Sequence, residues 1–137
     1  MATGRAGTPL ARKLGVKEGH RLGLFHAPAD WEIERLPAGV RISRDKGSEA
    51  DVVVAFFHDL GSLQREVARL ARTIVPDGAL WLAWPRRAAG HESDITDNGI
   101  RAAVLPLGLV DVKVAALGDH WSGLKMVWRT ELRPGLG

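Results

Sequence analysis

The chain of 137 residues has no cysteine, no tyrosine and only one asparagine. Without cysteine, disulfides, thiol catalysis and thiolate metal sites are excluded, and a reducing compartment is the natural setting. No apolar run approaches the roughly 18 residues that a membrane-spanning helix requires. We therefore expect a cytoplasmic protein with no membrane segment.

The composition is that of a globular domain, with 45% hydrophobic and 26% charged residues. A chain of this length can bury a core without disulfides or metals. We expect a single domain over residues 8–130, with flexible tails at 1–7 and 131–137.

The net charge is +3, and the basic side chains concentrate near the two ends of the chain. Arg12, Lys13, Lys17 and Arg21 lie near the N-terminus, whereas the central part is slightly acidic. A nucleic-acid-binding domain usually has a basic stripe on its folded body. Nucleic acid is therefore not the expected partner.

Hydrophobic periodicity divides the chain into alternating strands and helices. Strands are predicted at 21–25, 40–43, 51–57, 79–84, 109–117 and 121–128, and helices at 10–14, 30–36, 63–74 and 97–107. Ser62 and Thr96 are expected to cap the last two helices, and Pro76-Asp77-Gly78 to form a turn.

The continuous apolar run Val52–Phe57 is typical of a strand buried on both faces of a parallel sheet. Val110, Val112 and Val114 alternate with polar residues, which predicts a strand with one buried face. The last two strands should form a hairpin. The predicted fold is α/β: a reduced Rossmann-like, mainly parallel sheet with helices on its faces and a C-terminal antiparallel hairpin.

The link at 44–50 is the weak point of this assignment, because a parallel crossover usually needs about a dozen residues. Either the link is an extended hop, or the strand at 40–43 is misplaced.

A strand, a helix and a terminal antiparallel hairpin at the end of an open α/β sheet resemble class I S-adenosylmethionine-dependent methyltransferases. The turn Lys17-Glu18-Gly19 before the first strand and Asp77-Gly78 before a later one are similar to that family's turns. The resemblance covers most of the chain but lacks one strand–helix unit in the middle.

Three motifs also resemble a small bacterial family whose function is not established, over about residues 10–129. They are Leu14-Gly15-Val16-Lys17, Ala83-Trp84-Pro85-Arg86-Arg87 and Trp121-Ser122-Gly123-Leu124-Lys125. This resemblance implies the fold and no activity.

The loop after the first strand departs from the methyltransferase pattern. The family has a glycine-rich loop there, which lets the backbone approach the cofactor, whereas residues 26–30 contain no glycine, and Pro28 lacks a backbone donor. Asp45 is the one candidate for the acid that binds the ribose hydroxyls. We therefore expect no cofactor, with S-adenosylmethionine as the disfavoured possibility.

A ligand of an open α/β sheet binds beyond the carboxyl ends of the strands. The candidate ligand-binding residues there are His26, His58, Asp59, Trp84, Arg86, Arg87, His91, Asp94 and Thr96. Arg86 and Arg87, close to a helix start, could hold a phosphate or carboxylate. The spacing of the five histidines does not indicate a metal site.

These features favour a non-catalytic protein that binds a protein partner or a small anionic ligand. The first alternative is a methyltransferase with a degenerate cofactor loop. The second is a nucleic-acid accessory protein that uses its basic termini, and basic residues gathered on one folded face would favour it.

Overall fold

The structure is a computed structural model that describes residues 9–87, 90 and 92–136. The predicted tail at 1–7 lies outside this part. At the other end, Thr130–Leu136 forms the 3-10 helix η3, and the flexible tail expected at 131–137 stays a prediction. Among the described residues, no helix is long and apolar enough to cross a membrane.

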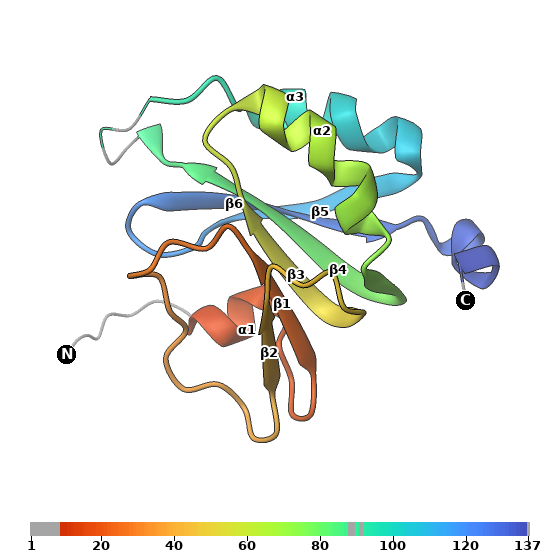
Figure 1. Ribbon diagram of the computed structural model, residues 1–137. Helices are drawn as coiled ribbons and strands as arrows, with labels where there is room; N and C mark the ends of the chain where they lie inside the picture. The colour runs from red at the N-terminus through yellow and green to blue at the C-terminus, as the bar shows by residue number, and fades with distance from the viewer. Residues whose placement is uncertain (1–8, 88–89, 91, 137) are drawn as a thin grey trace.

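A six-stranded mixed sheet forms the centre of the molecule (Figure 1). Its strands are β1 (Arg21–Phe25), β2 (Arg41–Arg44), β3 (Ala50–Phe56), β4 (Ile74–Pro85), β5 (Leu109–Ala116) and β6 (Trp121–Trp128). The helices are α1 (Leu10–Leu14), α2 (Leu60–Ala71) and α3 (Asp97–Val104), followed by the 3-10 turn η2 (Leu105–Leu107). The predicted fold class is confirmed.

The strand order is β2-β1-β3-β4-β6-β5; β1 to β4 pair in parallel, and β6 is antiparallel to both of its neighbours, β4 and β5. Because β1 lies between β2 and β3, the short link at 45–49 crosses over β1. Of the two interpretations of this link, the first is correct: the strand is placed correctly, and the link is a short connection without a helix. From β1 the chain passes to β2 on one side and then to β3 on the other, so the strand order switches between β1 and β3, and ligands of such sheets bind at the carboxyl ends of these two strands.

Each face of the sheet has its own core. On one face, Val53, Leu80 and Met126 pack beneath α2 and α3. On the other, Leu22, Val54 and Trp81 pack beneath α1 and the segment 26–40. The apolar stripe of α2 points inward, because Leu63, Val67, Leu70 and Ala71 are all buried as predicted.

The predicted helix at 30–36 is wrong: this segment is an irregular crossover from β1 to β2. Arg35 adopts a left-handed backbone (φ 57°), which no α-helix contains. Trp31 is nevertheless buried, so the apolar residues that suggested a helix do cover the sheet.

Two local predictions also need correction. Asp59, not Ser62, caps α2, and its side chain accepts a hydrogen bond from the Ser62 N–H. Residues 76–78 lie inside β4, where the pairing with β3 jumps from Ala50–Ile74 to Val52–Ala79. The expected turn is thus a bulge within one long strand.

A second bulge, between Asp111 and Lys113, overturns the predicted face of β5. The extra residue moves Lys113 onto the face that Val110 occupies and leaves Val112 and Val114 each 52% exposed. A simple alternation therefore does not describe this strand.

Candidate functional site

Two left-handed residues mark the carboxyl ends of the neighbouring strands β1 and β2. His26 (φ 60°) directly follows β1, and Asp45 (φ 55°) directly follows β2. The backbone N–H of His26 donates to Oδ1 of Asp45 at 2.8 Å, and the N–H of Asp45 donates to the Leu24 carbonyl at 2.8 Å. These bonds hold both residues in the left-handed conformation, which glycine adopts freely, Asp and Asn occasionally, and a histidine rarely.

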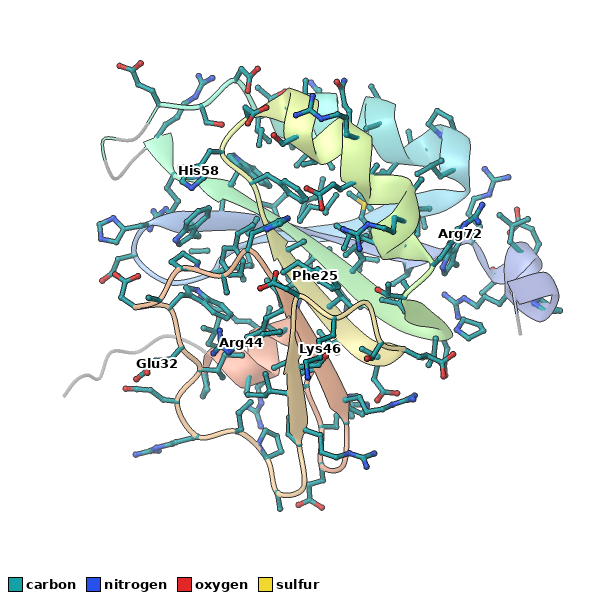
Figure 2. All side chains as sticks on the ribbon, in the orientation of Figure 1. Phe25, Glu32, Arg44, Lys46, His58 and Arg72 are labelled. Atoms are coloured by element: carbon teal, nitrogen blue, oxygen red, sulfur yellow. The ribbon has the colours of Figure 1, made fainter. Side chains whose placement is uncertain are left out.

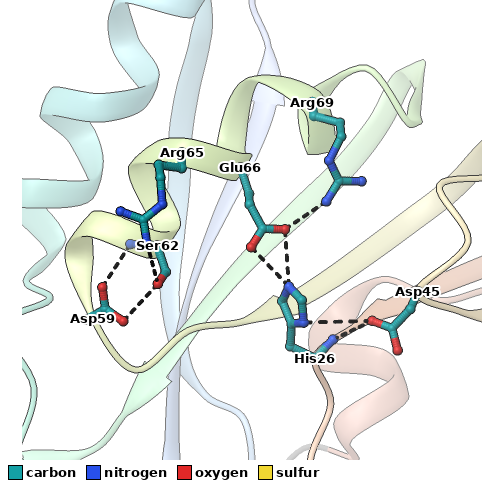
Figure 3. A network of polar contacts seen from close by, with 7 residues as sticks. All are labelled: His26, Asp45, Asp59, Ser62, Arg65, Glu66 and Arg69. Carbon is teal, nitrogen blue, oxygen red and sulfur yellow. Dashed lines mark hydrogen bonds and ion pairs between the residues drawn. The ribbon is translucent and has the colours of Figure 1, made fainter.

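The ring of His26 also contacts α2 (Figure 3). Its Nε2 lies 3.1 Å from Oε2 of Glu66, whose other oxygen accepts a hydrogen bond from Arg69 at 2.7 Å. The ring packs edge-on against Phe57, with 5.7 Å between the centroids. His26 thus joins the ends of β1, β2 and β3 to α2, and it does not face the other predicted site residues.

Several predicted site residues do meet at the carboxyl end of β3, where Figure 2 labels His58. His58, Asp59, Arg87 and Asp94 line a surface hollow of about 760 Å³ together with Glu92. The structure therefore brings together four of the nine candidates from three separate segments of the chain.

The charge of this hollow does not match an anionic ligand well. Three carboxylates, those of Asp59, Glu92 and Asp94, face one guanidinium, that of Arg87. Two of the carboxylates already have partners at the start of α2: Asp59 accepts from Ser62, and Asp94 accepts from the Leu60 N–H at 2.8 Å. The backbone bond from Ser62, followed by that from its hydroxyl, lowers the pKa of Asp59.

The other candidates have structural contacts of their own. Arg86 donates to the Asp119 carbonyl at 3.2 Å and Arg87 to the Ser93 carbonyl at 3.4 Å. Thr96 caps α3 as predicted, accepting from the Gly99 N–H, and Trp84 packs against the core beneath α2 and α3. His91 lies outside the described residues. The anion site at Arg86 and Arg87 stays a prediction.

A second hollow, of about 340 Å³, lies beside the first and shares His58 with it. Its walls include Pro28 from the loop after β1, Pro85 at the end of β4, and Trp121 at the start of β6. The Trp121 ring contacts His58 edge-on, with 5.4 Å between centroids. Sequence reasoning missed Trp121 as a site residue because it treated the hairpin as a closing element, although antiparallel pairing places Trp121 opposite Pro85.

Within residues 9–87, 90 and 92–136, no three or more His, Cys, Asp or Glu side chains lie together in an arrangement that could hold a metal ion.

Solved methyltransferase structures share this architecture. The chain superposes on a SAM dependent methyltransferase from Aquifex aeolicus with a TM-score of 0.51 and 11% identity, covering 86% of this chain and 87% of that one. It superposes on magnesium protoporphyrin IX methyltransferase from Synechocystis, solved with bound SAM, with a TM-score of 0.55 and 8% identity, covering 88% and 74%. For TrmN from Thermus thermophilus the TM-score is 0.50 at 17% identity, and the match covers 88% of this chain but only 47% of that protein.

No family model and no curated protein matches the chain. The resemblance to the small bacterial family therefore depends on its motifs alone. The class I methyltransferase-like architecture, in contrast, is shown by the fold.

The expectation that the chain has no cofactor is corrected by these neighbours, which point to S-adenosylmethionine. Two features of the site fit this cofactor. Asp45 stands at the end of β2, and His26 turns the chain after β1 with the left-handed backbone of a glycine. Pro28 remains a departure, because it offers no backbone donor.

Proposed function

We propose that this chain binds S-adenosylmethionine at the carboxyl ends of β1, β2 and β3 and acts as a methyltransferase. The observation that carries the proposal is the paired turn of His26 and Asp45. One oxygen of Asp45 holds the His26 N–H, while Oδ2 has no partner among the described residues, and the side chain is 61% exposed. That oxygen is suited to accept hydrogen bonds from ribose hydroxyls.

The rest of the ligand would follow the loop from His26 to Pro28 into the hollow beside Trp121. When bound, S-adenosylmethionine supplies an electrophilic methyl group. His58 borders this hollow, and a neutral imidazole there can accept the proton of an attacking hydroxyl or amine. Trp121 and Pro28 supply apolar walls, and Asp30 and Glu92 supply polar ones.

The test is calorimetric titration with S-adenosylhomocysteine of the wild type and of Asp45→Asn. The Asn side chain keeps an acceptor for the His26 N–H and tolerates the left-handed backbone, so the fold should persist. Loss of the charged acceptor should weaken binding by about 10- to 100-fold, which corresponds to roughly 1.5–3 kcal/mol.

Asp94→Asn is the matched control, because it removes the same charge from the neighbouring hollow and should leave binding within about twofold. Absence of a saturable heat with the wild type at millimolar ligand would overturn the proposal. Equal weakening by both variants would overturn the assignment to Asp45.

A second candidate is a non-catalytic protein that binds the same cofactor, favoured by the glycine-free loop with Pro28. Binding of S-adenosylhomocysteine without methyl transfer to any offered acceptor would support it. Arg86→Ala and Arg87→Ala in the same titration would test whether these side chains contribute an anion contact. A cytoplasmic location stays a prediction.

A further inference from the structure

Two lysines lie directly opposite each other on neighbouring strands. Lys113 of β5 pairs in register with Lys125 of β6, and Lys125 pairs in turn with Trp81 of β4. The three side chains form one row across the sheet on the face that α1 covers in part. The ammonium of Lys113 lies 5.9 Å from the centroid of the Trp81 ring. Like charges directly opposite in a sheet are destabilising.

More cations reach this face from the N-terminal part of the chain. Lys13 of α1 donates to the carbonyl of Ala116 in β5 at 3.2 Å. Lys17 follows α1 and, with Lys125, lines a hollow of about 300 Å³. We call Lys13, Lys17, Lys113 and Lys125 the lysine face. It joins segments about a hundred residues apart in the sequence.

No carboxylate of the described residues forms an ion pair with the lysine face. All 16 Asp and Glu residues belong to the described part of the chain, and none of them forms an ion pair with a lysine there. Asp51 and Asp77 line the same hollow as Lys17, but Asp51 accepts from Arg21 instead. Burial, together with Lys113 and Lys17, lowers the pKa of Lys125. An anion bound here would relieve this repulsion.

We propose that the lysine face binds the phosphates of a single-stranded nucleic acid. The cations extend over α1 and two strands, so they match a chain of phosphates better than one small ion. Basic residues gathered on one folded face were the feature expected to favour nucleic-acid binding. The lysine face is such a surface, because lysines that are far apart in the sequence lie together on it.

The shape of the surface favours a single strand over duplex DNA or a membrane. Reading a major groove needs a projecting helix or ribbon, and α2 and α3 lie on the opposite face of the sheet (Figure 1). A membrane surface needs an exposed apolar helix face, whereas Ala11 and Leu14 of α1 are buried in the core. The exposed middle of β5 and the cations beside it can follow a flexible phosphate backbone.

The experiment is fluorescence anisotropy with labelled oligouridine and oligothymidine of about 15 nucleotides, at several salt concentrations. Lys113→Glu should weaken binding at low salt by about tenfold or more. The double variant Lys113→Ala, Lys125→Ala should reduce the slope of log affinity against log salt by about 1.4, or 0.7 for each lost contact.

Lys46→Glu is the matched control. Lys46, labelled in Figure 2, lies on the link after β2, which is the edge strand opposite to β5, and its substitution makes the same change in net charge. It should change the affinity by less than about twofold. Equal weakening by Lys46→Glu and Lys113→Glu would overturn the proposal, because it would show a response to net charge alone. Binding to phosphatidylserine vesicles that depends on Lys113, without oligonucleotide binding, would assign the face to a membrane and overturn it as well.

The thermal stability of Lys113→Glu separates a binding role from a structural one. The introduced carboxylate would face Lys125 as an opposite charge, so the melting temperature should rise by about 2–4 °C while nucleic-acid binding falls. A fall in both would show that Lys113 supports the fold. Titration with S-adenosylhomocysteine should be unchanged in this variant, so this proposal and the proposed cofactor site can fail independently.

Discussion

The indole Nε1 of Trp31 donates a hydrogen bond of 2.8 Å to the backbone carbonyl of Leu117, 86 residues further along the chain. Trp31 belongs to the irregular crossover after β1, and Leu117 begins the turn of the β5–β6 hairpin. The ring also packs edge-on against Phe56, with 4.8 Å between centroids. A single side chain thus fixes the crossover, which has no helix of its own, to the far end of the sheet.

We expect Trp31→Phe to destabilise the protein by about 1–3 kcal/mol, because the buried carbonyl of Leu117 would lose its indole donor. Urea unfolding followed by far-UV circular dichroism measures this change. Trp84→Phe is the control, since the half-buried Trp84 indole has no hydrogen-bond partner within the described residues. The interpretation would be wrong if the two variants lost equal stability.

The sequence was sufficient for the parallel centre of the sheet and for the final hairpin. The uninterrupted run from Val52 to Phe57 can be buried only with cover on both faces, and β3 has that cover. Leu124 and Met126 alternate with Lys125 and Val127, and β6 buries them accordingly. Both patterns are local, which is why they could be predicted.

The features that failed depend on contacts distant in sequence. Helical spacing of apolar residues at 30–36 does not reveal that Arg35 takes a left-handed backbone or that Trp31 bonds to Leu117. Likewise, the alternation of apolar and polar residues in β5 does not predict its bulge. Because the bulge places Lys113 opposite Lys125, the lysine face could not be predicted either.

Part of the candidate site was predictable for the same reason. The carboxyl ends of parallel strands meet at one edge, so His58 and Arg87 were expected to converge, and they line one hollow. His26 was expected there too, but its ring is held by Glu66 of α2. No local pattern in the sequence indicates that contact.

The ion pair between Arg101 of α3 and Asp111 of β5 should make stability depend on pH. Nε of Arg101 lies 2.9 Å from Oδ2 of Asp111, and this hydrogen bond lowers the pKa of Asp111 below its ordinary value of 3.8. A carboxyl whose pKa is lower in the folded state stabilises the fold above its ordinary pKa, and this contribution is lost as the pH falls.

We therefore expect Asp111→Asn to lower the free energy of unfolding at pH 7 and to make less difference at pH 3. Urea unfolding of both proteins at the two pH values gives the comparison. A difference between wild type and variant that is as large at pH 3 as at pH 7 would show that the ion pair is not the cause.

The N-cap of α2 offers a separate test of Asp59. Its two carboxylate oxygens accept from the backbone N–H and the hydroxyl of Ser62, each at 2.9 Å. Asp59→Ala should lower the melting temperature by about 2–4 °C, whereas Asp59→Asn keeps a capping side chain and should lower it much less. Thermal unfolding of the two variants checks this, and an equal loss in both would contradict the capping role.

Gly123 of β6 occupies a position where even a methyl group has no room. A Cβ there would overlap Cδ1 of Leu117 and lie 3.1 Å from Cε3 of Trp81, and both side chains are fully buried. Gly123→Ala should therefore destabilise the protein by about 1–3 kcal/mol through overpacking. Gly61→Ala, in the first turn of α2, is the control: its Cβ would come no closer than 3.4 Å to a neighbour, and the better helix former should stabilise the protein by about 0.5–1 kcal/mol.

Urea unfolding should move the midpoints of the two variants in opposite directions. A Gly123→Ala midpoint at or above that of the wild type would show that the hairpin and Trp81 can separate, and that the packing which closes the end of the sheet near the second hollow is loose.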